Sequence, residues 1–277
     1  MNNAAMISFT DQLFALQRHY HRREWVQCDP IAFLYRYPAV RDREIAGLIA
    51  SSLAYGRVRQ IQKSVSTVLD RMGSSPYAFL METRDVTLKR HFGGFRHRFT
   101  SEDDLIRLLT GIRRVILEYG SLNRCFQRAV NGNHRTTHDA LGLFTREIAG
   151  PDTSYNSLLP SPEKGSACKR LHLFLRWMVR HDAVDPGGWD GIDPSRLAVP
   201  LDTHLHAITR HLGVTNRRQV DIETAQEITR FFAEIDPSDP VRFDFALTRI
   251  GIFRDTIERH FPAETIAALK NERGLVS

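Results

Sequence analysis

The chain has few cysteines, and none are paired at a spacing that binds metal. Its 277 residues include three cysteines, Cys28, Cys125 and Cys168, with no Cys-x-x-Cys motif. A zinc ribbon or a four-cysteine iron–sulfur cluster therefore cannot be built from this chain alone. A sparse, odd count is also typical of a reducing compartment. We expect a cytoplasmic protein without a cofactor.

Long apolar runs and strand-like patterns are also missing. No uncharged apolar stretch reaches the roughly 18 residues that a membrane-spanning helix needs. Residues 1–10 lack the basic segment followed by an apolar one that marks a signal peptide. Alternation of apolar and polar residues never extends beyond about four positions, and there is no internal repeat. These absences exclude a membrane partner and predict a nearly all-α protein.

Helical periodicity is what the sequence does contain. In residues 57–72, for example, Ile61, Val65, Val68 and Leu69 share one face, and Gly73 follows as a stop. Similar patterns predict helices opening near Phe9, Pro30 and Asp42, and over 77–81, 101–118, 138–148, 168–179, 202–211, 221–235 and 239–251, with one more after 254. We expect a monomer with a single two-lobed helical domain over residues 1–277. Its lobes are approximately 40–150 and 151–277, with a cleft between them.

The charge balance is moderately basic. Lys and Arg number 38 against 32 Asp and Glu, which gives a formal net charge of +6, while 42% of the residues are hydrophobic. This is the composition of a globular protein with ample core material. The positive excess favours a polyanionic partner only weakly, because many basic proteins bind no nucleic acid.

The segment Pro200-Leu201-Asp202-Thr203-His204-Leu205 predicts a helix that begins after Asp202. Asp202 would be the N-cap, with its carboxylate accepting backbone N–H groups at the positive end of the helix dipole. A plain capping role is one interpretation. The same carboxylate could also face a pocket and stabilise a developing cation. His204 and His206 point to different sides of that helix, so we expect no metal site there.

A tight connection precedes the helix that carries Lys169. The hairpin lies near residues 159–169, and its Pro160-Ser161-Pro162-Glu163-Lys164-Gly165 stretch could expose backbone N–H groups to a phosphate. An ordinary loop is the alternative. Lys169 follows at the edge of an apolar helix, where partial burial could make it a nucleophile, or where it could simply extend into solvent.

These segments together resemble the helix–hairpin–helix DNA glycosylase superfamily. The resemblance rests on Leu159-Pro160, Gly165, Lys169-Arg170-Leu171, Pro200-Leu201-Asp202-Thr203-His204 and Arg210-His211-Leu212-Gly213, and extends over about residues 40–255. It implies Lys169 as nucleophile and Asp202 as its electrostatic partner, acting on a base flipped out of damaged double-stranded DNA. The chain also resembles an uncharacterised bacterial family of this fold.

The resemblance also implies DNA contacts and a reaction. Lys164 and Gly165 would hold DNA at the hairpin. Leu53 and Tyr55 lie where the superfamily has a wedge, a residue that is inserted into the DNA base stack, and Arg57 would bind a neighbouring phosphate. The hairpin has one glycine where the superfamily usually has two. Lys169 follows this glycine, Gly165, by more residues than the superfamily lysine usually does, so Lys164 is an alternative nucleophile. The long segment between Lys169 and Asp202 is similar to that of archaeal 8-oxoguanine glycosylases.

Trp189 lies in the intervening loop, and two interpretations of it are equally open. It could line the substrate pocket and stack on a flipped base, or it could anchor the loop in the core. The predicted function is base-excision DNA glycosylase, with strand cleavage through a lysine Schiff base and 8-oxoguanine as leading substrate. The alternative is a nucleic-acid-binding protein that keeps the fold without the chemistry.

Overall fold

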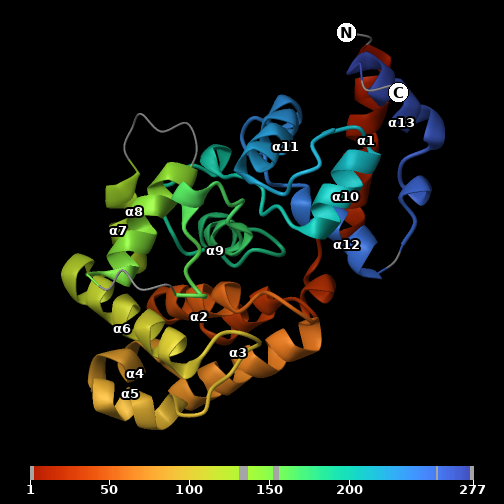
Figure 1. The fold of residues 1–277 in the computed structure, drawn as a ribbon. Coiled ribbons are helices and arrows are strands. Elements are labelled where there is room, and N and C mark those ends of the chain that lie inside the picture. The colour runs from red at the N-terminus through yellow and green to blue at the C-terminus, as the bar shows by residue number, and fades with distance from the viewer. Residues whose placement is uncertain (1–2, 131–136, 152–155, 254, 275–277) are drawn as a thin grey trace.

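The computed structural model describes residues 3–130, 137–151, 156–253 and 255–274. These ranges are helical and contain no strand, with isolated bridges at His97–Thr100 and Ser166–Asp221, so the all-α prediction is confirmed (Figure 1). The α-helices are α1 (Asn3–Tyr20), α2 (Val40–Ser52), α3 (Val58–Met72), α4 (Pro76–Glu82), α5 (Asp85–Phe92), α6 (Glu102–Tyr119), α7 (Leu122–Ala129), α8 (His138–Ala149), α9 (Lys169–Val179), α10 (Thr203–His211), α11 (Ile222–Ile235), α12 (Asp244–Phe253) and α13 (Ala263–Glu272). Short 3-10 helices are η1 (Arg23–Val26), η2 (Pro30–Arg36), η3 (Pro162–Lys164), η4 (Pro194–Arg196) and η5 (Ile257–Arg259).

Helix starts follow their capping residues closely. Ser101 and Asp104 form a reciprocal capping box at α6, which satisfies two backbone donors that the first turn leaves open. Asp221 caps α11 by accepting the N–H of Thr224 at 2.8 Å. Elsewhere the predictions are less accurate: α12 begins at Asp244 rather than Asp239, and the eight-residue helices α5 and α7 are not predicted at all, although Ser121 caps α7.

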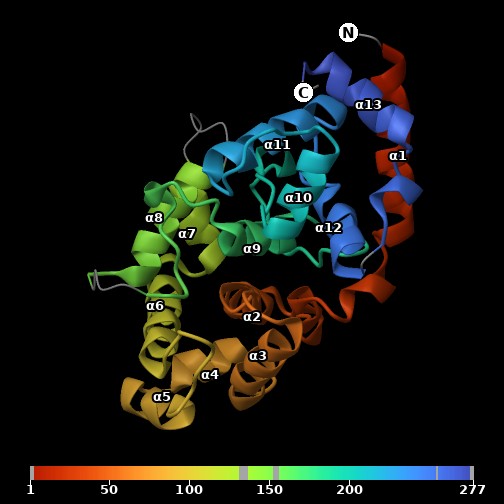
Figure 2. The ribbon, with the colours of Figure 1, turned by 45° about the vertical axis from the view of Figure 1, so that its right-hand side comes forward.

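The helices form two groups on either side of α9 (Figures 1 and 2). One group contains α2 to α8, in which α6, α7 and α8 pack on one another. The other contains α10 to α13 together with α1, which packs on α12 and α13. Gln12 donates to the Thr265 hydroxyl at 3.1 Å, so the two ends of the chain belong to the same group.

Helix α9 is the buried centre of the molecule. Its side chains Leu171, Phe174 and Leu175 are fully buried, and α2 packs directly against it. Gly47 allows the two helices to approach, because a Cβ there would lie 3.4 Å from both the Met178 sulfur and the Phe174 ring. The N-terminus of α9, where Lys169 lies, is thereby held at a fixed place between the two groups.

A buried ionic network joins α9 to α12. Arg176 donates from Nη1 to both carboxylate oxygens of Asp244, at 2.9 and 2.8 Å, and from Nε to Asp185 at 3.2 Å. Arg180 pairs with Asp185 and donates to Asp239 at 3.1 Å. Burial alone would lower the pKa of Arg176, but the two carboxylates outweigh it and hold that pKa above its usual range. The network fixes α12 and the loop after α9 against α9.

Within the described ranges, every helix is too short or too polar to cross a lipid bilayer.

Candidate active site

Lys169 is the first residue of α9 and follows a strained backbone position. Cys168 has a φ of 42°, which is uncommon for a residue with a side chain and turns the chain sharply into the helix. Cys168 itself is buried, and that burial raises the pKa of its thiol to about 11, so it is not a reactive thiolate. The turn leaves the Lys169 side chain 34% exposed at the surface between the two helix groups.

Asp202 caps α10, as its sequence predicts. Its Oδ1 accepts the N–H of Leu205 at 2.8 Å, and the carboxylate is 16% exposed. Because one oxygen serves the cap, the other is free to face a different group. The N-cap interpretation and a role at a site are therefore compatible in this geometry.

The second oxygen of Asp202 contacts Lys169. Asp202 Oδ2 lies 3.1 Å from Lys169 Nζ, although the two residues are far apart in the sequence. The loop that follows α9 is hydrogen-bonded to the end of that helix. The N–H of Gly187 donates to Trp177 O at 3.0 Å, and the N–H of Trp189 donates to Met178 O at 2.8 Å. An amine and a carboxylate, both partly exposed, thus meet at the junction of α9 and α10.

The hairpin before α9 is a tight 3-10 turn. Gly165 has a φ of 73°, and its N–H donates to Pro162 O at 3.2 Å, while the N–H of Lys164 donates to Ser161 O at 3.4 Å. The turn itself therefore uses these two backbone donors, which the sequence assigned to a phosphate. Lys164 and Gly165 are exposed, and Lys169 rather than Lys164 makes the ion pair with Asp202.

Trp189 does not line a substrate pocket, and that prediction is wrong. The side chain is 6% exposed and packs among Phe126, Phe144 and Phe174, with the Phe174 ring 5.0 Å away. Its indole N–H donates to Glu44 at 2.9 Å. The alternative interpretation, a loop anchor in the core, is the one that the structure supports.

Glu44 is a residue that the sequence analysis did not single out. Its buried carboxylate also accepts the N–H groups of Leu122 and Asn123, both at 3.1 Å, at the start of α7. Burial raises the pKa of Glu44, although these hydrogen bonds act in the opposite direction. Glu44 could have been found in the sequence as a charged residue on an otherwise apolar helix face, because a buried charge needs hydrogen-bond partners.

Of the predicted wedge residues, Leu53 is buried and Tyr55 is not. Leu53 is 0% exposed, so the prediction that it contacts DNA is wrong. Tyr55 is half-buried and Arg57 is exposed at the start of α3, so both stay candidates.

Two histidines lie beside the first turns of α8 and α9. His172, one turn beyond Lys169, has its Nε2 atom 3.2 Å from His138 Nδ1, and the rings are stacked. Among the described residues, the other ring nitrogen of His172 has no hydrogen-bond partner. Burial, with the nearby His138 as a second cause, lowers the pKa of His172 to about 3.

This lowered pKa makes the stability of the protein pH-dependent. The unfolded chain binds a proton at His172 near pH 6.5, whereas the folded chain does not, so stability is lost as the pH falls below that value. We expect wild type to lose about 2 kcal/mol more than His172→Phe between about pH 7 and pH 5. Urea unfolding at several pH values measures this. His91→Phe, at an exposed position, should behave as wild type, and an unchanged slope in His172→Phe would contradict the prediction.

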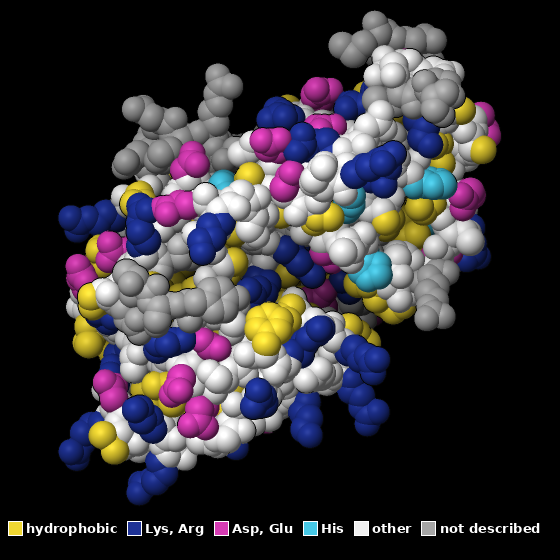
Figure 3. Space-filling model, viewed as in Figure 1, with side chains coloured by type: hydrophobic (Ala, Val, Ile, Leu, Met, Phe, Trp, Pro, Cys, Tyr) yellow, Lys and Arg dark blue, Asp and Glu magenta, His cyan; other side chains and the backbone are white. Residues whose placement is uncertain are grey.

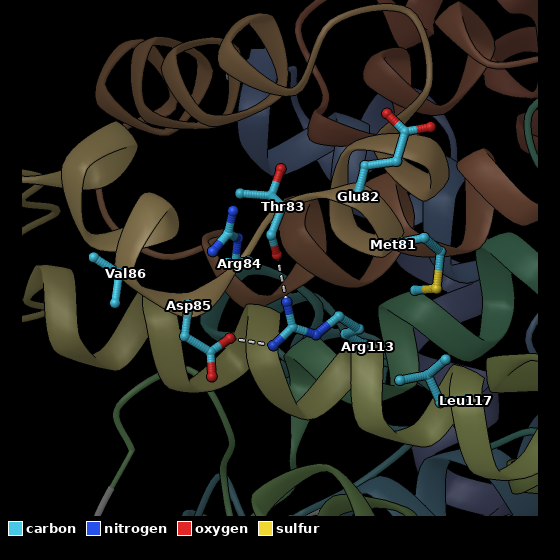
Figure 4. A pocket seen from close by; sticks show the side chains of 8 residues that line it. All are labelled: Met81, Glu82, Thr83, Arg84, Asp85, Val86, Arg113 and Leu117. Carbon is cyan, nitrogen blue, oxygen red and sulfur yellow. Dashed lines mark hydrogen bonds and ion pairs between the residues drawn. The ribbon is translucent and has the colours of Figure 1, made fainter.

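A separate pocket of about 400 Å³ lies on the α4–α6 side of the molecule (Figure 4). Within it Arg113 donates to the Thr83 carbonyl at 2.6 Å and to the Asp85 carboxylate. It is lined by Met81, Glu82, Thr83, Arg84, Asp85, Val86, Arg113 and Leu117. None of these residues belongs to α9 or α10, so this pocket is not part of the Lys169–Asp202 site.

Comparison with known proteins places the site inside a family match. A family model described as "Protein of unknown function (DUF2400)" matches residues 29–253. The chain belongs to this family. The match extends from η2 to α12 and so contains both Lys169 and Asp202. No curated protein and no solved structure matches the chain.

Proposed function

We propose that this DUF2400 protein is a base-excision DNA glycosylase in which Lys169 attacks the sugar of a damaged nucleotide. The observation that carries the proposal is the 3.1 Å distance between Lys169 Nζ and Asp202 Oδ2 at a partly exposed junction. An amine nucleophile beside a carboxylate is the pair that this chemistry needs, since the carboxylate can accept a proton and stabilise a cationic transition state. The resemblance of both segments to the superfamily supports the same assignment.

Lys169 and Asp202 can together move the protons that this reaction needs. The ammonium of Lys169 gives a proton to Asp202, and its lone pair forms a bond to C1′ while the C1′–N bond breaks. The departing base takes that electron pair and a proton returned by Asp202. The Lys169 nitrogen then gives a second proton to O4′ as the C1′–O4′ bond breaks, which opens the sugar ring and leaves a protonated Schiff base between Lys169 and C1′. Asp202, again a carboxylate, accepts a C2′ proton; the C2′–H electron pair forms a C2′–C3′ double bond, and the C3′–O bond breaks with the phosphate leaving as an anion, which cleaves the strand.

We propose 8-oxoguanine as the leading substrate. The support is the length of the segment between Lys169 and Asp202, which is similar to that of the archaeal 8-oxoguanine enzymes. The net charge of +6 is compatible with a DNA partner.

Covalent trapping tests this proposal. The full-length protein is incubated with duplexes that contain 8-oxoguanine, uracil, an alkylated purine or an abasic site, in the presence of sodium borohydride. The hydride reduces the Schiff base to a stable secondary amine, so a protein–DNA adduct is expected on denaturing gels. Base release and DNA binding are measured alongside. Binding without base release or an adduct on any duplex would reject the glycosylase assignment and favour the non-catalytic nucleic-acid-binding alternative.

A further inference from the structure

An exposed aromatic pair lies outside the Lys169–Asp202 contact. Phe99, in the loop between α5 and α6, is 61% exposed. Its ring stacks on Tyr55, with ring centroids 4.9 Å apart and planes 29° apart. Tyr55 supports one face of the phenyl ring, and much of the Phe99 side chain remains open to solvent.

Contacts with buried residues hold the turn that carries Phe99. His97 and Thr100 exchange backbone hydrogen bonds of 3.1 and 2.9 Å, and both side chains are buried. The Tyr55 hydroxyl donates to His97 O at 2.9 Å, while His97 Nε2 lies 3.0 Å from Tyr55 O. Ser64 completes the support, with its hydroxyl 2.9 Å from His97 Nδ1. Because these contacts fix the turn, Phe99 loses little conformational freedom when a ligand stacks on it.

The same turn holds Arg98 in a strained conformation. Its φ of 54° lies in the left-handed region, which is unfavourable for a residue with a side chain. The side chain lies over Gly56, where an added Cβ would be 2.8 Å from Arg98 Cδ. The strain and the close approach both keep a guanidinium near the Tyr55–Phe99 pair. Such strain persists only where surrounding contacts over-determine it, and it is frequent at binding sites.

Arg170 connects this pair to the candidate active site. Its guanidinium lies 5.0 Å from the Tyr55 ring centroid and donates to the carbonyls of Ser52 and Ser157, at 2.6 and 2.8 Å. Arg170 directly follows Lys169, so the first turn of α9 carries both the amine and a support for the aromatic pair. On the face drawn in Figure 3, a hydrophobic patch flanked by Lys and Arg side chains is visible over the loop between α5 and α6.

We propose that Phe99, supported by Tyr55, is a stacking platform for an unpaired nucleobase of the DNA. Arg98, which precedes Phe99, and the exposed Arg57, two residues after Tyr55, contact the phosphates on either side of that base. The inference rests on the proposed DNA partner but not on the reaction at Lys169. An aromatic side chain can stack on any base, because every base has a π face. The surrounding arginines favour a polyanion over an apolar protein partner.

Equilibrium binding tests the platform. The full-length protein is titrated into two labelled duplexes of the same sequence, one fully paired and one with a single unpaired base, and fluorescence anisotropy is followed at fixed salt. Phe99→Ala should weaken binding to the second duplex by about tenfold. Its affinity for the paired duplex should change by less than about twofold. Phe99→Trp should keep the wild-type preference. Leu117→Ala, at a position 71% exposed on the α4–α6 side, is the matched control and should leave both affinities unchanged.

The outcomes separate this inference from the proposed reaction. Equal affinities of wild type and Phe99→Ala for the duplex with the unpaired base would overturn the platform. An equal loss on both duplexes, or no DNA binding at all, would overturn it as well. A preference that depends on Phe99, in a protein that forms no borohydride adduct, would support the platform and reject the glycosylase.

Discussion

Replacing Lys169 with alanine should reduce borohydride trapping by more than about a thousandfold, as expected when a covalent nucleophile is removed. In the part of the chain that the structure describes, Lys169 is the amine that lies 3.1 Å from Asp202, so we expect no other side chain to take over. Affinity for lesion-containing DNA should fall only slightly, since a single exposed charge contributes little to a polyanion interface. Single-turnover trapping and anisotropy, measured on the same duplex, separate the two quantities.

Lys164→Ala is the matched control for this experiment. Lys164 is an exposed lysine on the hairpin close to Lys169 in the sequence, so the variant removes the same charge from the same region. It should trap at the wild-type rate, with at most a small loss of affinity. Loss of trapping in Lys164→Ala, together with normal trapping in Lys169→Ala, would transfer the nucleophile to Lys164 and contradict the assignment.

Replacing Arg176 with methionine should destabilise the protein by about 3–5 kcal/mol. Arg176 is 3% exposed and pairs with two carboxylates, Asp185 and Asp244, which are 0% and 3% exposed. Methionine fills a similar volume but leaves negative charge in a dry interior, and the cost of an uncompensated buried charge exceeds the value of an ordinary hydrogen bond. Urea unfolding followed by far-UV circular dichroism measures the change in the free energy of unfolding.

Arg146→Met provides the surface comparison. Arg146 pairs with Glu163, but both side chains are more than half exposed, at 58% and 59%. Exposed ion pairs contribute about 0–1 kcal/mol, so this variant should unfold close to wild type. A loss below about 1 kcal/mol in Arg176→Met would mean that the network does not hold α9 and α12 together as described.

The sequence was most informative where the determining interactions are local. Ser101 predicts the start of α6 and Asp202 that of α10, because an N-cap side chain bonds to backbone only a few residues away. The glycine at position 73 predicts the end of α3 for a similar reason. Helices α5 and α7 were missed, since each is only eight residues long, shorter than the stretch of about 11 residues over which a helical period can be recognised.

Side-chain environment was less predictable than secondary structure. Trp189 lies in a Gly- and Pro-rich loop, and nothing in the neighbouring residues shows that Glu44, from a distant helix, accepts its indole N–H. Leu53 and Tyr55 are two positions apart, yet one is buried and the other supports an exposed ring. Such differences depend on which other elements pack against a segment, and that information is non-local.

The sequence by itself determined the helical class of this protein, the caps of α6, α10 and α11, and the residue types of a lysine and a carboxylate suited to one another. Only the tertiary structure decided that Lys169 and Asp202 meet, because their contact depends on the loop pinned along α9 and on the packing of α2 against that helix. It also decided that Phe99 is presented to solvent on a turn held by His97 and Thr100. Local hydrogen bonds are encoded by neighbouring residues, whereas the meeting of distant side chains follows from how the whole core is packed.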